Sequence, residues 1–72
     1  MKNKYIVSAE TRYDAMNDRS YFKAVKTFKH EENARSFYED PKSLRMYGNL
    51  VLEKIDDSGT HMWDDVAERW FQ

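Results

Sequence analysis

Cysteine is absent from this 72-residue chain, and the chain has only two glycines and one proline. Without cysteine, neither a disulfide nor a thiolate metal site can stabilise the fold, so a secreted disulfide-rich mini-protein is excluded. Two glycines cannot build a glycine-rich phosphate loop. No apolar run approaches the ~20 residues of a membrane-spanning helix, and the N-terminus lacks the apolar core of a signal peptide. A cytoplasmic protein without membrane contact is therefore expected.

Aromatic residues, by contrast, are plentiful, with five Tyr, four Phe and two Trp. We expect a single domain over residues 1–72, and a chain this short buries only ~60% of its unfolded surface. Aromatic side chains bury the most area per residue, so they should supply much of the core. A free energy of unfolding of roughly 5 kcal/mol is the expectation for a domain of this size.

Charge is divided unevenly along the chain, although the net charge is only −1. Residues 1–30 contain seven basic and three acidic residues, whereas residues 31–72 contain five basic and ten acidic residues. Such a division indicates either a charged partner or a basic strand pair that neutralises an acidic second half. The second interpretation is preferred here, and the first stays open.

Strand alternation marks the first part of the chain. Lys4–Arg12 is predicted as a strand, residues 13–19 as an exposed loop, and Ser20–Phe28 as a strand that pairs back. Met16 in the loop is expected to cover the sheet as a lid, with an exposed contact residue as the alternative.

The two faces of the returning strand differ in character. Phe22, Ala24 and Phe28 share one face with Lys26, and the two phenylalanines predict that this face meets the core. Lys23 falls on the opposite face and is expected to point to solvent.

Helical spacing follows the second strand. Glu31–Asp40 is predicted as a helix, because Ala34, Phe37 and Tyr38 fall at i, i+3 and i+4 and form one apolar stripe. Pro41 should end this helix, since the residue before proline avoids helical angles.

A connector and a second hairpin are predicted next. Lys42–Arg45 is assigned as the connector and Met46–Ile55 as the third strand, whose Leu50–Leu52 run suggests a central place in the sheet. Asp56–Gly59 predicts a hairpin connection of three to five residues, and Thr60–Trp63 a short fourth strand.

Residues 64–71 allow two interpretations. Trp63, Val66, Ala67 and Trp70 sit at i, i+3, i+4 and i+7, which predicts a short C-terminal amphipathic helix. A continued, twisted fourth strand is the alternative. The predicted fold is an α+β domain with a small antiparallel sheet in the order β-β-α-β-β, one helix packed on one face, and this optional C-terminal helix.

Residues with catalytic or metal-binding potential are scattered. His61 precedes Asp64 and Asp65, and His30 precedes two glutamates, but neither group has the spacing of a zinc site. No serine lies in a Gly-x-Ser-x-Gly turn. A domain this small seldom encloses a pocket of enzyme size. We therefore expect no enzyme activity, no catalytic residue, no metal and no cofactor.

Basic residues interleaved with aromatics on the first strand pair form a candidate nucleic-acid-binding surface. A two-stranded ribbon can enter a DNA major groove, and aromatics on a sheet can stack on unpaired bases. The candidate residues are Arg12, Arg19, Tyr21, Lys23, Lys26 and Lys29. The acidic second half opposes polyanion binding, so nucleic-acid binding is the alternative function.

The step from the second strand into the helix supports the same alternative. Thr27-Phe28, Glu31-Glu32 and Ala34 resemble the small arm-binding modules at the N-termini of phage integrases, over residues 5–38. That resemblance implies nucleic-acid binding through the first strand pair.

Protein interaction is the leading hypothesis, because a small domain rich in aromatics with segregated charge suits docking on a partner. Tyr and Trp are favoured interface anchors. The candidate protein-binding residues are Trp63, Asp64, Asp65, Glu68 and Trp70. Such an acidic aromatic edge would complement a basic groove on the partner. Both tryptophans could instead belong to the core.

The layout as a whole resembles small proteins encoded by phages or mobile elements, including anti-CRISPR inhibitors. The residues that carry this resemblance are Met1, Lys2, Tyr5, Ile6 and Val7 at the start and Arg69-Trp70 at the end. It implies a stoichiometric inhibitor or adaptor that binds a host protein. The expected function is thus a non-enzymatic protein-interaction module, monomeric or homodimeric.

Overall fold

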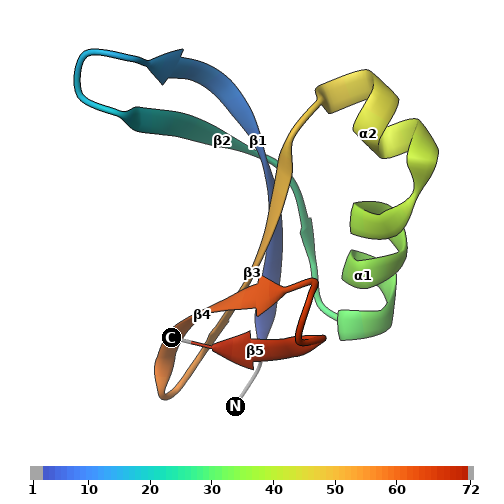
Figure 1. The fold of residues 1–72 in the computed structure, drawn as a ribbon. Helices are drawn as coiled ribbons and strands as arrows, with labels where there is room; N and C mark the ends of the chain where they lie inside the picture. The colour runs from blue at the N-terminus through green and yellow to red at the C-terminus, as the bar shows by residue number, and fades with distance from the viewer. Residues whose placement is uncertain (1–2, 72) are drawn as a thin grey trace.

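The computed structural model describes residues 3–71. Met1 and Lys2, which contribute to the resemblance to phage proteins, lie outside the described residues. Figure 1 shows an antiparallel sheet with the helices on one side of it. The element order is β-β-α-α-β-β-β, so the predicted α+β class with a small antiparallel sheet is confirmed, and a second helix and a fifth strand are added.

Within residues 3–71, the sheet has five strands in the order β2-β1-β3-β4-β5. The strands are β1 (Lys4–Asp14), β2 (Arg19–Phe28), β3 (Leu50–Asp56), β4 (Gly59–Asp64) and β5 (Arg69–Phe71). The central position predicted for the third strand is confirmed, and β2 and β5 form the two edges. The connection between β3 and β4 is shorter than predicted, because Asp56 pairs with Gly59 and only two residues lie between them.

Two helices replace the one predicted. The helix over Glu31–Glu39 (α1) is confirmed, but Pro41–Tyr47 forms a second helix (α2) where a connector was expected. The Lys42 N–H donates to the Asp40 carboxylate at 2.9 Å, which caps α2. Proline in the first helical turn loses no hydrogen bond there. Asp-Pro thus ends α1 and begins α2, a signal that the connector assignment missed.

Gly48 ends α2. Its φ of 80° is a conformation that residues with a side chain rarely adopt, and its N–H donates to the Leu44 carbonyl at 2.8 Å. A Cβ added there would meet no atom within 4 Å, so the backbone angle rather than crowding demands glycine. The third strand therefore begins at Leu50, not at Met46 as predicted.

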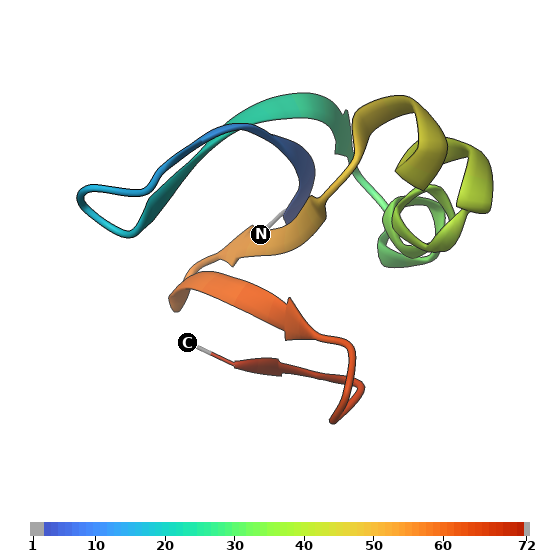
Figure 2. The same cartoon turned by 45° about the horizontal axis from the view of Figure 1, so that its top comes forward.

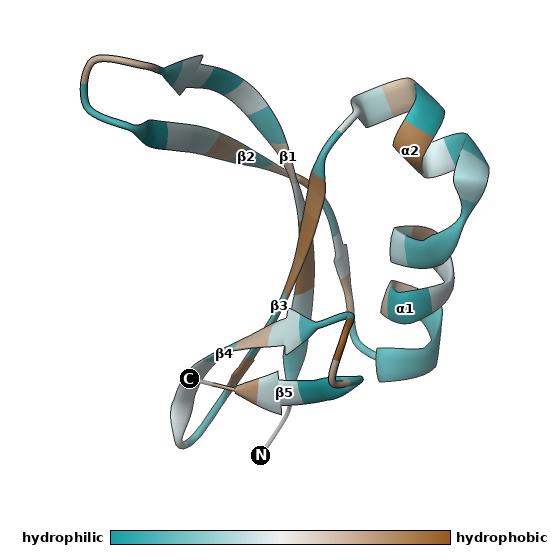
Figure 3. Ribbon diagram, in the orientation of Figure 1, coloured by the Kyte–Doolittle hydropathy of each residue, from teal (hydrophilic) through white to brown (hydrophobic). Residues whose placement is uncertain are grey.

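The core lies between α1 and one face of the central strands. The buried hydrophobic residues are Tyr5, Val7, Ala9, Ala34, Leu50 and Leu52. Val7 and Leu52 are 0% and 1% exposed, and they are partners across β1 and β3. Figure 3 shows hydrophobic stretches along β1 and β3. The stripe predicted for the helix is also confirmed, because Ala34 is buried and the two aromatics of α1 pack against the core.

A β-bulge at Val25 overturns the predicted faces of β2. The pairing of β1 with β2 shifts register there, so side-chain alternation reverses. Val25 and Phe28 both pack against the core. Phe22 is 44% exposed and Ala24 is also exposed, so the prediction that they face the core is wrong. Lys23 is exposed, as predicted.

Residues 64–71 form a loop and a fifth strand, so the predicted C-terminal helix is wrong. The Asp64 Oδ1 atom accepts the N–H groups of Val66 at 2.9 Å and Ala67 at 3.2 Å. Glu68 then takes a positive φ of 53° and directs the chain back along β4. An aspartate that bonds the following backbone in this way competes with helix formation. The apolar spacing predicted a helix, but this local turn prevailed.

Candidate functional site

The β1–β2 pair extends well past the helices (Figures 1 and 2). Residues 10–23, called the projecting hairpin below, include no buried residue. The last core residue on β1 is Ala9, at 7% exposure. This hairpin carries four of the six residues predicted to bind nucleic acid, on a part of the chain that buries none of its side chains.

Local hydrogen bonds order the tip of the projecting hairpin. Asp14 Oδ1 accepts the Met16 N–H at 3.1 Å, and Asp14 Oδ2 accepts the side-chain amide of Asn17 at 2.8 Å. These bonds, the amide of Asn17 foremost, lower the pKa of Asp14. The Tyr13 hydroxyl donates to Asp18, which raises the pKa of Tyr13. The tip therefore has a defined conformation despite its exposure.

Met16 is 96% exposed at this tip. The prediction that it covers the sheet as a lid is wrong, and the alternative of an exposed contact residue fits its position.

One face of the projecting hairpin is basic. Arg12 pairs with Tyr21 across the two strands, and the guanidinium carbons of Arg12 and Arg19 lie 4.2 and 5.3 Å from the Tyr21 ring centroid. Lys23 falls on the same face, because side chains alternate along a strand. The structure thus brings together four of the six residues predicted to bind nucleic acid.

The other two lie apart from that face. The Lys26 ammonium is 5.5 Å from the ring centroids of both Phe28 and Phe37, so it sits against α1. Lys29 lies at the approach to α1 and lines a shallow depression there.

The opposite face of the projecting hairpin is apolar and weakly acidic. Tyr13 and Phe22 are 56% and 44% exposed. Glu10 pairs with Phe22, and hydrogen bonds from Ser20 and Asn49 lower the pKa of its carboxylate. The Asn49 side chain donates at 2.9 Å and so links the base of the hairpin to the start of β3.

The two tryptophans predicted to bind a partner meet each other in the second hairpin. Trp63 and Trp70 pair across β4 and β5, with ring centroids 5.2 Å apart in an edge-to-face arrangement. Trp70 also lies 6.0 Å from the Tyr5 ring, and the Arg35 guanidinium lies 4.4 Å from the Trp63 ring. Both are half-buried and pack against the core. Their contacts favour the core interpretation over that of interface anchors.

The acidic residues beside them have structural contacts as well. Asp64 holds the loop, as described above, and Asp65 Oδ2 accepts the Tyr38 hydroxyl at 2.6 Å. Burial, together with this hydrogen bond, raises the pKa of Tyr38. Glu68 is exposed at the turn. The five predicted protein-binding residues therefore lie together. Trp63, Asp64 and Trp70 are half-buried, whereas Asp65 and Glu68 are exposed.

The loops of the two hairpins repeat one design. Asp14–Arg19 and Asp64–Arg69 each begin with an aspartate, span four loop residues and end with an arginine that pairs with that aspartate. The fourth loop residue has φ of 49° in one and 53° in the other. The second loop residue, Met16 or Val66, is 96% exposed in both. The signal Asp-x-x-x-x-Arg next to aromatic residues was present in the sequence and was missed.

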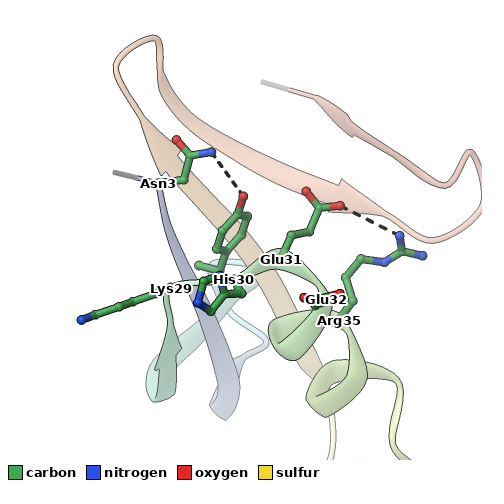
Figure 4. A pocket seen from close by; sticks show the side chains of 7 residues that line it. Asn3, Lys29, His30, Glu31, Glu32 and Arg35 are labelled. Atoms are coloured by element: carbon green, nitrogen blue, oxygen red, sulfur yellow. Dashed lines mark hydrogen bonds and ion pairs between the residues drawn. The ribbon is translucent and has the colours of Figure 1, made fainter. Parts of the chain in front are cut away.

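A mixed-charge depression of about 480 Å³ lies at the start of α1 (Figure 4). Its lining residues are Asn3, Tyr5, Lys29, His30, Glu31, Glu32 and Arg35. Glu31 and Arg35 form an ion pair at 4.0 Å, and Asn3 donates to the Tyr5 hydroxyl at 3.3 Å. The glutamates already complement the positive end of the helix, so the depression offers no single-sign charge to a ligand.

A polar cluster holds the turn between β3 and β4. The Ser58 hydroxyl donates to Asp56 Oδ1 at 2.7 Å, and His61 Nε2 lies 2.8 Å from Ser58 Oγ and 3.1 Å from Asp56 Oδ1. In a Ser-His-Asp triad the carboxylate and the hydroxyl meet different ring nitrogens, whereas here both meet Nε2. The cluster therefore has the geometry of a turn network. Hydrogen bonds from Ser58 lower the pKa of Asp56 to about 2.

Comparisons with known proteins leave the geometry as the guide to function. No protein-family model, curated protein or solved structure matches the chain. Among residues 3–71, no group of three or more histidines and carboxylates is arranged to hold a metal ion. Within the same residues, no helix has the length and apolarity that crossing a membrane requires.

Proposed function

We propose that this chain is a non-enzymatic protein-interaction module that docks on a partner protein through the projecting hairpin. The observation that carries the proposal is an exposed hairpin, residues 10–23, that adds nothing buried to the core yet is ordered by its own hydrogen bonds. A pre-ordered surface binds with less entropic cost than a flexible one.

The exposed residues of the hairpin have the composition of a protein interface. Aromatic residues, methionine and arginine are enriched in interface cores. Tyr13, Met16 and Phe22 are all exposed, and Arg12 and Arg19 are exposed on the other face. A stoichiometric inhibitor or adaptor, as the resemblance to phage-encoded proteins implies, needs such a surface and no active site.

Nucleic-acid binding is the second candidate, favoured by the gathering of Arg12, Arg19, Tyr21 and Lys23 on one face. The acidic residues Asp64, Asp65 and Glu68 belong to the β4–β5 hairpin, which lies at the opposite edge of the sheet from β2 (Figure 1). Three cations, however, neutralise few phosphates, whereas strong salt-dependent binding involves roughly 6–10 phosphate contacts. This candidate therefore ranks second.

A photo-crosslinking residue at position 22 tests the proposal. Phe22→p-benzoylphenylalanine places the probe on the projecting hairpin, and Met46→p-benzoylphenylalanine places it on α2, where the native side chain is 74% exposed. Irradiation in the native host should give a protein adduct from position 22 only, with a mass equal to one copy of each chain. A nucleic-acid adduct would support the second candidate instead. Equal adducts from both positions, or none, would overturn the hairpin as the binding surface.

A further inference from the structure

β2 has an open outer edge. It is the first strand in the order β2-β1-β3-β4-β5, and among the described residues only β1 pairs with it. It is ten residues long, whereas the other edge strand, β5, has three. A long edge strand presents unpaired N–H and C=O groups on which another chain can form a further strand.

The pairing register identifies which backbone groups point outward. The Glu10 N–H donates to the Asn49 carbonyl at 3.0 Å, on the β3 side, so the backbone groups of Glu10 point away from β2. Its partner Phe22 therefore directs its own N–H and C=O to the open edge. The same alternation applies to Ala24, which pairs with Ser8 two residues earlier on β1. Beyond Ala24 the bulge interrupts this regular edge.

The charge of β2 determines which kind of strand can pair with its open edge. The strand contains Arg19, Lys23 and Lys26 and no acidic residue, and Lys29 follows it. Two copies of this edge would bring like charges together, which destabilises strand pairing. Lysines on an edge strand commonly serve to prevent such association. The same lysines complement an acidic strand. The charge of β2 therefore disfavours pairing with a second copy of this chain and favours pairing with an acidic segment.

The side chains flanking the edge define the pattern of that segment. Arg19 and Lys23 project on one face, and Phe22, 44% exposed, projects on the other with Ala24. A strand lying alongside would present alternate residues to these two faces. Carboxylates therefore suit the positions beside the arginine and lysine, and apolar side chains suit those beside the phenylalanine.

We propose that β2 accepts an extended partner segment of alternating acidic and apolar residues, which joins the sheet as a sixth strand between Ser20 and Ala24. This inference rests on the proposed function and specifies the chemistry of its partner. Main-chain hydrogen bonds at Phe22 and Ala24 supply affinity, and the basic side chains supply specificity, as in other cases of strand addition.

Titration with a blocked eight-residue peptide of alternating Glu and Val tests the charge requirement. Binding should shift the backbone amide signals of Phe22 and Ala24. Arg19→Glu combined with Lys23→Glu should weaken peptide binding by about tenfold or more, because the strand would then repel the acidic peptide. Lys42→Glu combined with Arg45→Glu makes the same change in net charge on α2, and should weaken it by about twofold or less at physiological salt.

N-methylated peptides test the strand itself. Methyl groups on alternate backbone nitrogens can be placed in two registers, of which only one blocks donors facing β2. One register should abolish binding and the other should leave it unchanged. Equal binding by both methylated peptides and the parent would show attraction by charge alone and would overturn strand addition. Tighter binding of an eight-nucleotide single-stranded DNA than of the peptide would overturn it too.

The outcomes separate this inference from the proposed function. A peptide that does not bind, together with a protein adduct from position 22, overturns strand addition and leaves the proposed function standing. Absence of that adduct overturns the proposed function, whatever the peptide does. Register-dependent peptide binding together with the adduct supports both.

Discussion

At the scale of single residues, Asp14, Asp40, Asp56 and Asp64 share one role. Each carboxylate accepts backbone N–H groups at the start of a turn or helix. An ionised carboxylate is a strong acceptor, and it satisfies donors that the turn leaves without a backbone partner. Part of the acidic excess in the second half of the chain therefore shapes turns. Composition alone could not show whether these acidic residues shape turns or bind a charged partner.

Asp56 gives this role a pH dependence. Hydrogen bonds from Ser58 hold the pKa of Asp56 at about 2, below its ordinary value of 3.8. The ionised form therefore stabilises the folded state above about pH 4, and this contribution is lost as the pH falls from about 4 to about 2. Acid unfolding followed by tryptophan fluorescence should show a shallower loss of stability over this range in Asp56→Asn than in the parent.

Asp57→Asn, one residue further on, is the matched control. It removes a carboxylate from the same turn, and it should leave the steepness of the parent acid transition in place. An equal change in both variants would mean that the loss of a charge, and not the bonds to Asp56, sets the acid response.

At the scale of elements, the two equivalent loops contribute differently to stability, because the hairpins that carry them differ in burial. β5 brings Trp70 into contact with Tyr5, whereas residues 10–23 of the projecting hairpin include no buried residue. Asp64→Ala should therefore lower the free energy of unfolding by about 1 kcal/mol through its lost hydrogen bonds. Urea denaturation monitored by tryptophan fluorescence measures this loss.

Asp14→Ala is the paired variant in the projecting hairpin. It should leave the urea midpoint almost unchanged while amide exchange speeds up locally in residues 12–21, since segments with few buried contacts open below the global free energy. Equal losses of global stability in the two variants would show that the projecting hairpin unfolds together with the core, contrary to this expectation.

Elements with a strong hydrophobic periodicity were predictable from the sequence. Elements whose conformation depends on a bulge or on a local side-chain hydrogen bond were not. The stripe of Ala34, Phe37 and Tyr38 specified α1, and the apolar run of β3 specified a central strand. No distinct residue type marks the bulge at Val25, so the residues of β2 that face the core were predicted wrongly. The tail had helical spacing, but the turn at Asp64 prevailed over it.

The candidate site was likewise predictable only in part from the sequence. The basic and aromatic character of the first strand pair could be recognised from composition, and the structure gathers four of those six residues on one face. Which strand forms an open edge depends on the order of strands in the sheet, which no local pattern contains. Both the core and the interface interpretation of the tryptophans stayed open, because sequence cannot separate a half-buried aromatic from an exposed one.

At the scale of the whole molecule, the fold is a small core with a long extension. The radius of gyration is 12.6 Å, above the ~11 Å expected for a compact domain of this length. Two of the six buried hydrophobic residues in the described part of the chain are alanines, so large buried side chains are few there. Stability should therefore depend heavily on single core residues.

Leu52→Ala tests this dependence. Leu52 is 1% exposed on the central strand, and its truncation should cost about 2–5 kcal/mol, a large part of the stability of so small a domain. Leu44→Ala makes the same change on α2, where the side chain is 48% exposed, and should cost about 0.5 kcal/mol or less. Urea midpoints compare them, and similar losses would contradict the assignment of the core.

The repeated loop design also bears on how such a protein could change over generations. The loop requires an aspartate at its start and a residue that tolerates a positive φ near its end, and its second residue, Met16 or Val66, is almost fully exposed. Figure 1 shows the tip of the projecting hairpin far from the loop that joins β4 and β5. Substitutions at Met16 and Val66 therefore remove no core contact, so these two positions can vary over generations while the fold is inherited intact.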